Sequence, residues 1–152
     1  MMRRVLPLTF FIILVVSIVF AYADYSFTGY YLPKGYKVTA TITVPDAPVW
    51  PGEIKGTGVG LEDQGSDTRI IVYGFGWHGF FEIRTGIKVI KEVTNPDGSV
   101  ERKELAKVDQ GVPKGDYKIT IVYGYDGYVK ISYNDKHLYS FQGDLAKYAI
   151  IS

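Results

Sequence analysis

Five residues in turn-like stretches of the sequence have the chemistry of a binding surface. Trp50 stands between closely spaced prolines, Trp77 and His78 stand among glycines, and the pair Tyr125 and Asp126 precedes another glycine. Flat aromatic rings stack against the C–H faces of sugars, and a nearby carboxylate accepts hydrogen bonds from sugar hydroxyls. We therefore expect these residues to bind a glycan. The alternative is that Tyr and Trp are simply favoured in strands and lie half-buried there.

Catalytic and cofactor-binding spacings do not support an enzyme. Residues 74–79 match the glycine spacing of a dinucleotide-binding loop, but a strand-like segment, 80–84, follows where that chemistry needs a helix N-terminus. A glucanase strand of the type Glu-x-Asp-x-Glu, which aims alternate carboxylates into one cleft, does not occur in the sequence. We therefore expect a protein without catalytic activity and rank a glycoside hydrolase third among the possible functions.

Metal-binding residues are sparse. His78 and His137 are the two histidines, and the chain has no Cys, so a transition-metal site is not expected. Glu62, Asp63 and Asp67 cluster near one turn and offer the oxygen ligands that Ca²⁺ prefers. Calcium is therefore the one cofactor that the sequence suggests, and a solvated acidic turn is the alternative.

Composition and charge narrow the class of protein. The 152 residues carry 17 basic and 16 acidic side chains, so a net charge of +1 gives no electrostatic basis for a nucleic-acid partner. The 13 Tyr, 8 Phe and 17 Gly favour a β-rich fold with many turns. The absence of Cys, together with few Asn and Gln, is typical of proteins from hot environments.

The N-terminal residues predict export. A basic start at 1–4 precedes an uncharged apolar run at 5–20, and Ala21-Tyr22-Ala23 fits a signal-peptidase site. We expect a signal peptide at 1–23 and a single domain at 24–152, located outside the cell or on its surface. An uncleaved membrane anchor is the alternative, because the 19 residues at 5–23 are enough to cross a bilayer. In that case the membrane contact would be made by this segment.

The first half of the expected domain alternates between apolar and polar residues. Residues 36–44 place Tyr and aliphatic side chains on one face and Lys and Thr on the other, which predicts a half-buried strand. A proline-rich loop that displays Trp50 is expected at 45–55. The segments that follow are an extended segment at 56–63, a turn at 64–67, a central strand at 69–75, a glycine-rich joining loop at 74–79 and a short central strand at 80–84.

The second half predicts two sets of antiparallel strands. Segments 87–94 and 99–108 flank Asn95-Pro96-Asp97-Gly98 and predict a charged hairpin, although the good helix formers in 99–108 leave a helix as the alternative. Alternation at 117–123 and 129–133, followed by 137–142, predicts a three-stranded meander, and 147–151 can add a last strand. Nine or ten short strands indicate an antiparallel sandwich or barrel.

The meander also resembles a known family. The runs 115–123, 127–136 and 138–141 are similar to the corresponding hairpins of concanavalin A-like lectins and glucanases and of laminin-G-like domains. This resemblance implies an all-β antiparallel jelly-roll sandwich, preceded here by the hydrophobic signal or anchor helix. It supports a non-catalytic carbohydrate-binding module whose partner is a glycan or another cell-envelope component. The alternative is a structural subunit of an extracellular filament or surface layer, in which strand edges pair between copies as a homo-oligomer.

Overall fold

The computed structural model describes residues 27–63, 67–143 and 148–151 of the chain. These residues form ten strands and no helix, which confirms the all-β prediction. The predicted signal segment at 1–23 and residues 64–66 of the predicted turn lie outside the described residues. Within the described part, no helix has the length and apolarity needed to span a bilayer.

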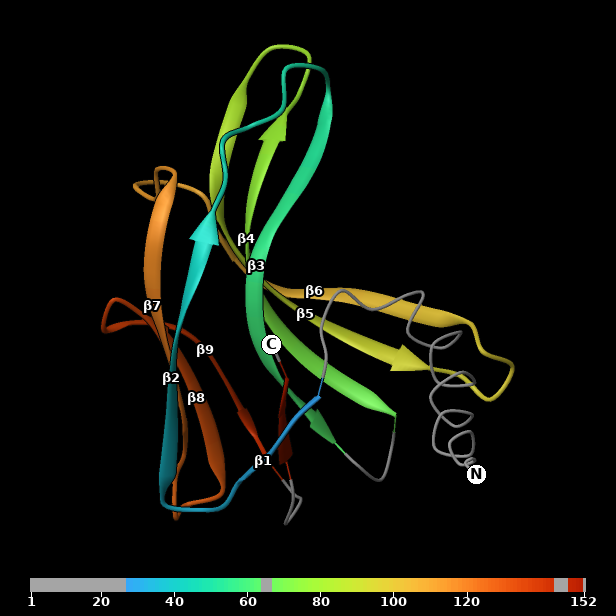
Figure 1. The fold of residues 1–152 in the computed structure, drawn as a ribbon, viewed down its shortest axis with the longest axis vertical. Coiled ribbons are helices and arrows are strands. Elements are labelled where there is room, and N and C mark those ends of the chain that lie inside the picture. The colour runs from blue at the N-terminus through green and yellow to red at the C-terminus, as the bar shows by residue number, and fades with distance from the viewer. Residues whose placement is uncertain (1–26, 64–66, 144–147, 152) are drawn as a thin grey trace, which may run out of the picture.

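The strands form two antiparallel sheets, and each sheet contains a meander (Figure 1). Five of the connections are hairpins between neighbouring strands of one sheet, so the strand order leaves the predicted jelly-roll connectivity unconfirmed. The six-stranded sheet has the order β1 (Phe27–Leu32), β10 (Tyr148–Ile151), β3 (Gly52–Asp63), β4 (Thr68–His78), β5 (Ile83–Thr94) and β6 (Val100–Val108). The four-stranded sheet has the order β2 (Tyr36–Val44), β7 (Gly115–Tyr123), β8 (Tyr128–Tyr133) and β9 (Lys136–Gln142).

The main core lies between the two sheets. Alternate residues of β2, β7 and β8 face inward, as the sequence pattern predicts, and the innermost aliphatic side chains of the core are at most 2% exposed. Burying one such side chain contributes about 1.5–3 kcal/mol. Among the described residues, every strand and every member of the two buried clusters lies between Phe27 and Ile151, so a chain that starts at Asp24 retains all of them. The inward-facing members of the main core include Ile42, Val44, Val59, Leu61, Val72, Ile87, Val89, Ile119, Ile121 and Ile131.

The charged hairpin is made by β5 and β6. The Asn95 backbone N–H donates to the Ser99 carbonyl at 2.8 Å, and Gly98 takes a positive φ of 90° at the turn. Asp97 accepts hydrogen bonds from the Ser99 backbone and hydroxyl at 2.9 and 2.6 Å, which lower the pKa of the Asp97 carboxyl. These turn contacts and the β5–β6 ladder confirm the hairpin over the helix alternative for 99–108.

The segment around the glycines differs from the prediction. β4 continues to His78, so residues 74–78 belong to a strand and not to a joining loop, and Phe80–Glu82 is a turn that precedes β5 and not a strand. The reason is the spacing of Gly74 and Gly76, which places both on one face of β4. A Cβ on Gly74 would lie 2.7 Å from Cα of Val44. These glycines therefore let the end of β2 and the loop after it lie directly on β4.

Candidate functional site

One end of the six-stranded sheet carries the largest exposed apolar side chains. The loop at 45–51 and the turn at 79–82 form this end, which stands at the top of Figure 1, beyond the end of β2. The exposed fractions are 80% for Val49, 78% for Trp50, 85% for Phe80 and 100% for Phe81. We call these four residues the apolar apex. Such concentrated exposure of large apolar groups indicates a contact surface.

The 45–51 loop is held against β4 by specific contacts. A Cβ on Gly76 would lie 2.6 Å from the Asp46 carbonyl carbon, so the absence of a side chain there makes room for the loop. The His78 Nδ1 lies 2.9 Å from the Pro48 carbonyl oxygen. Because a carbonyl can only accept, Nδ1 carries the proton, and in the neutral ring Nε2 is left as a hydrogen-bond acceptor. Lys114 adds an ion pair to Asp46 at 3.1 Å.

The 79–82 turn is closed by its own backbone. The Gly79 N–H donates to the Glu82 carbonyl at 2.8 Å, and Phe80 and Phe81 occupy the two corners between them. The Trp77 ring lies over Gly79, where a Cβ would come within 2.8 Å of the ring atom Cζ2. The missing side chain at Gly79 therefore leaves room for the Trp77 ring beside the turn.

A pocket lies between the loop and the turn. Its volume is about 470 Å³, which is within the usual size range of ligand pockets. Its lining is mostly apolar, and His78 and Glu82 are the residues with polar side chains. Its lining consists of Pro51, Gly52, Trp77, His78, Gly79, Phe80, Phe81 and Glu82.

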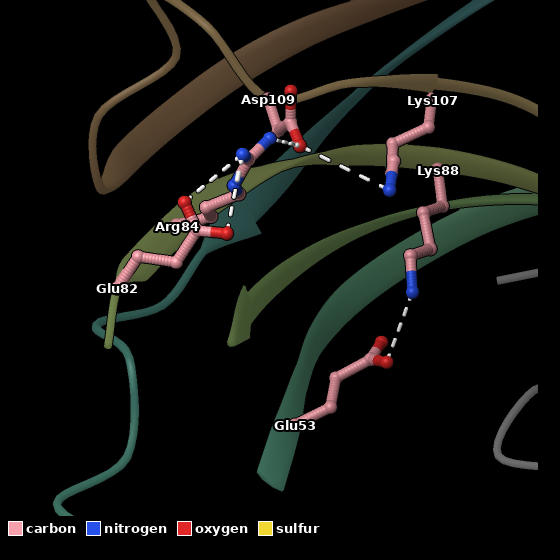
Figure 2. A network of polar contacts seen from close by, with 6 residues as sticks. All are labelled: Glu53, Glu82, Arg84, Lys88, Lys107 and Asp109. Carbon is pink, nitrogen blue, oxygen red and sulfur yellow. Dashed lines mark hydrogen bonds and ion pairs between the residues drawn. The ribbon is translucent and has the colours of Figure 1, made fainter. Parts of the chain in front are cut away.

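A network of paired charges lies behind the apex (Figure 2). We call its six residues the charged collar: Glu53, Glu82, Arg84, Lys88, Lys107 and Asp109. Three acidic and three basic groups give the collar no net charge.

Arg84 is the centre of the collar. Its guanidinium contacts Asp109 at 2.8 Å and Glu82 at 3.0 Å, while Lys107 approaches Asp109 at 3.9 Å. The hydrogen bond from Arg84 lowers the pKa of Asp109 against the opposing effect of desolvation. The same hydrogen bond, with the one to Glu82, raises the pKa of Arg84.

The collar is continuous with a second buried cluster on the outer face of the six-stranded sheet. This cluster contains Ile71, Tyr73, Phe75 and Ile90, with Trp77 packed against it. Lys88 Nζ lies 4.6 Å from the centre of the Phe75 ring and 2.9 Å from a Glu53 carboxylate oxygen. The Tyr73 hydroxyl donates to the other Glu53 oxygen at 3.2 Å. These contacts make the base of the site a rigid part of the sheet.

The predicted ligand-binding residues separate into two groups. Trp50, Trp77 and His78 lie together at the apolar end of the molecule. Tyr125 and Asp126 lie in the β7–β8 turn, which is at the opposite end of the sandwich because β7 begins beside Val44 and ends beside Tyr36. The Tyr125 ring covers Gly35, and the Asp126 carboxylate accepts a hydrogen bond from the Tyr128 N–H at 3.0 Å. The two groups therefore cannot contact one small ligand.

The residues considered for calcium have other contacts. The Arg69 guanidinium lies 3.5 Å from the Glu62 carboxylate, and Asp63 follows on the other face of the strand. The Asp67 carbonyl accepts a hydrogen bond from the Thr94 N–H at 3.0 Å. Among the residues that the structure describes, no group of three or more His, Cys, Asp or Glu side chains is placed to hold a metal ion. The calcium site stays a prediction without structural support.

Phe80 and Phe81 are the site residues that the sequence reasoning missed. An apolar pair with β propensity was expected to be a buried strand, yet both side chains point into solvent from a turn. The signal that could have identified them is their adjacency, because neighbouring residues of a strand point to opposite faces and both faces would need a cover. Gly79 before the pair is consistent with a turn.

A comparison with protein-family models and a search of curated proteins found no match for this chain.

Proposed function

We propose that this protein is a non-catalytic binding module, secreted or displayed on the cell surface, that recognises a glycan at its apolar end. The observation that carries the proposal is the pocket of about 470 Å³, whose lining combines Trp77 and the two exposed phenylalanines with the polar residues His78 and Glu82. Aromatic walls with a few polar groups suit a sugar, which presents apolar C–H faces and hydroxyls on one ring.

Preorganisation favours binding at this site. Trp77 packs against the outer buried cluster, and His78 is hydrogen-bonded to the Pro48 carbonyl at 2.9 Å. A ligand therefore does not have to order these side chains, each of which would otherwise cost about 0.5–1.5 kcal/mol on binding. Glu82, paired with Arg84 at 3.0 Å, offers a hydroxyl an ionised and oriented acceptor.

The same geometry supports recognition rather than hydrolysis. A retaining glycosidase needs two carboxyl groups about 5 Å apart across the scissile bond. Among the described residues that line the pocket, Glu82 supplies the single carboxylate, and Arg84 holds it as an ion pair.

Kinship with concanavalin A-like jelly rolls belongs to the same proposal. Two antiparallel sheets that pack face to face support it, as does the predicted meander from β7 to β9. Strands β3 to β6 are consecutive neighbours in one sheet, and a jelly-roll relative would have to share this connectivity.

Tryptophan fluorescence of the chain 24–152 tests the glycan proposal. We expect a soluble polysaccharide from a broad panel to shift the emission, with about tenfold weaker binding in Trp77→Ala and His78→Gln, which change two residues that line the pocket. Tyr125→Ala is the matched control, because Tyr125 is an exposed aromatic residue (83%) at the far end of the molecule. No response to any glycan, or equal weakening by the control, would refute the proposal.

A further inference from the structure

We propose that the apolar apex inserts into the interfacial layer of a lipid bilayer with electrically neutral headgroups. The apex presents two phenylalanines, one valine and one tryptophan to solvent, each at least 78% exposed. This inference goes beyond glycan recognition, because it concerns a lipid surface that carries no sugar.

The shape of the molecule suits contact with a plane. The 45–51 loop and the 79–82 turn stand side by side at one end of the long axis of the molecule (Figure 1). The apex can therefore reach a flat surface without a collision with β7, β8 or β9. Concave binding of a polymer would not require the 100% exposed Phe81 side chain to project past the pocket.

The order of side chains matches the polarity of a bilayer interface. Phenylalanine gains free energy from hydrocarbon contact, and Trp is enriched at the level of the headgroups. The Gly79 N–H is already bonded to the Glu82 carbonyl at 2.8 Å, so this part of the turn does not enter the interface with an unmet hydrogen bond. Neither Val49–Pro51 nor Gly79–Phe81 contains a charged residue.

The charges behind the apex determine which lipid surface fits. The collar pairs three acids with three bases, and Asp46 at the loop pairs with Lys114 at 3.1 Å. Paired charges cost less to bring near a low-dielectric layer than single charges do. A neutral collar also gives no attraction to anionic headgroups, unlike a polybasic patch. Binding should therefore be insensitive to salt and to anionic lipid.

Vesicle binding by the chain 24–152 tests the inference. We expect it to bind vesicles of phosphatidylcholine alone, equally at low and high salt, and no better when phosphatidylglycerol is added. Phe80→Ser combined with Phe81→Ser should weaken the partition coefficient by about a hundredfold, from the loss of two exposed apolar side chains. Tyr125→Ser at the opposite end should bind like the wild type.

The location of the contact is read from Trp50. In Trp77→Phe, Trp50 is the remaining tryptophan, and its emission should shift to the blue and be quenched by brominated phosphatidylcholine. Urea midpoints show whether the double variant is folded, and Phe81→Ser alone serves if it is not, with an expected loss of about tenfold.

Four results would overturn the inference. The first is that the wild-type protein does not bind phosphatidylcholine vesicles. The second is that the Phe variants bind as strongly as the wild type does. The third is that binding needs phosphatidylglycerol and disappears in high salt. The fourth is self-association of the wild type that the Phe variants abolish while vesicles are not bound, which would assign the apex to a second copy of the chain. Because these vesicles carry no glycan, none of the four results decides the glycan proposal.

Discussion

Replacing Gly74 by Ala tests the contact that brings the two loops of the site together. An added Cβ would meet the Thr43 carbonyl oxygen and lie 2.7 Å from Cα of Val44, whereas real Cβ atoms essentially never come within 3.0 Å of such atoms. The obstructing atoms belong to backbone, so a change of rotamer cannot relieve the clash. The end of β2 must therefore move away from β4.

The cost of that movement follows from what holds β2. Val44 is 1% exposed in the main core and pairs with Gly115 of β7, so its backbone cannot retreat without disturbing both. Overpacking of a well-filled interior costs about 1–3 kcal/mol, and the rigid surroundings place Gly74→Ala at about 2–3 kcal/mol. With a urea m value of about 2 kcal/mol/M, the unfolding midpoint falls by about 1 M or more.

Urea unfolding followed by far-ultraviolet circular dichroism measures this effect. Gly124→Ala is the comparison, because there the nearest atom is the side-chain oxygen of exposed Asp126, which can rotate away at the cost of its hydrogen bond from the Tyr128 N–H. We expect it to lower stability by about 1 kcal/mol at most, which is less than the expected effect of Gly74→Ala. A Gly74→Ala midpoint equal to that of the wild type would show that β2 does not lie on β4 as described.

Three further predictions concern single polar contacts. His78→Phe keeps a ring but removes the hydrogen bond to the Pro48 carbonyl, so unfolding stability should fall by about 1 kcal/mol and Trp50 anisotropy should decrease. Asp109→Asn should reduce the loss of stability on acidification. The pKa of Asp109 is lowered in the folded state, so the carboxylate stabilises the fold above the unfolded pKa of about 3.9, and this stabilisation is lost as the pH falls through the folded pKa. Urea midpoints at neutral and acidic pH measure the difference. Arg102→Met removes the guanidinium that lies 2.7 Å from the Glu92 carboxylate, a β5 side chain that is 8% exposed. The loss of stability should be about 1–3 kcal/mol in the same assay, and an unchanged midpoint would contradict the pairing.

Elements with strict alternation were predicted well from the sequence. The meander from β7 to β9 and the β5–β6 hairpin occur where expected, because the side-chain period of a strand is two and each turn has residues that accept its geometry. Asn134 and Asp135 take positive φ at the β8–β9 turn, which explains how that turn forms without glycine. These features depend on neighbours in the chain.

The region around Gly74 and Gly76 was predicted less well. Glycine lowers strand propensity, so the sequence predicts a loop at 74–79. The structure instead continues β4 through both glycines, because the backbone of residues 43–47 packs where their side chains would be. The burial of Phe80 and Phe81 was likewise overestimated, since an apolar residue is not buried unless another element covers it. Both errors arise from contacts with distant segments.

Local sequence is enough to predict strands with two different faces and a loop around Trp50, because alternation and proline act through local geometry. Long-range contacts bring Trp50, Trp77 and His78 to one end of the molecule and place Tyr125 and Asp126 at the other. That arrangement depends on strand register and on which backbone can lie against a glycine, and both are properties of residues far apart in the chain. The exposure of Phe80 and Phe81, on which the lipid inference depends, was decided in the same way.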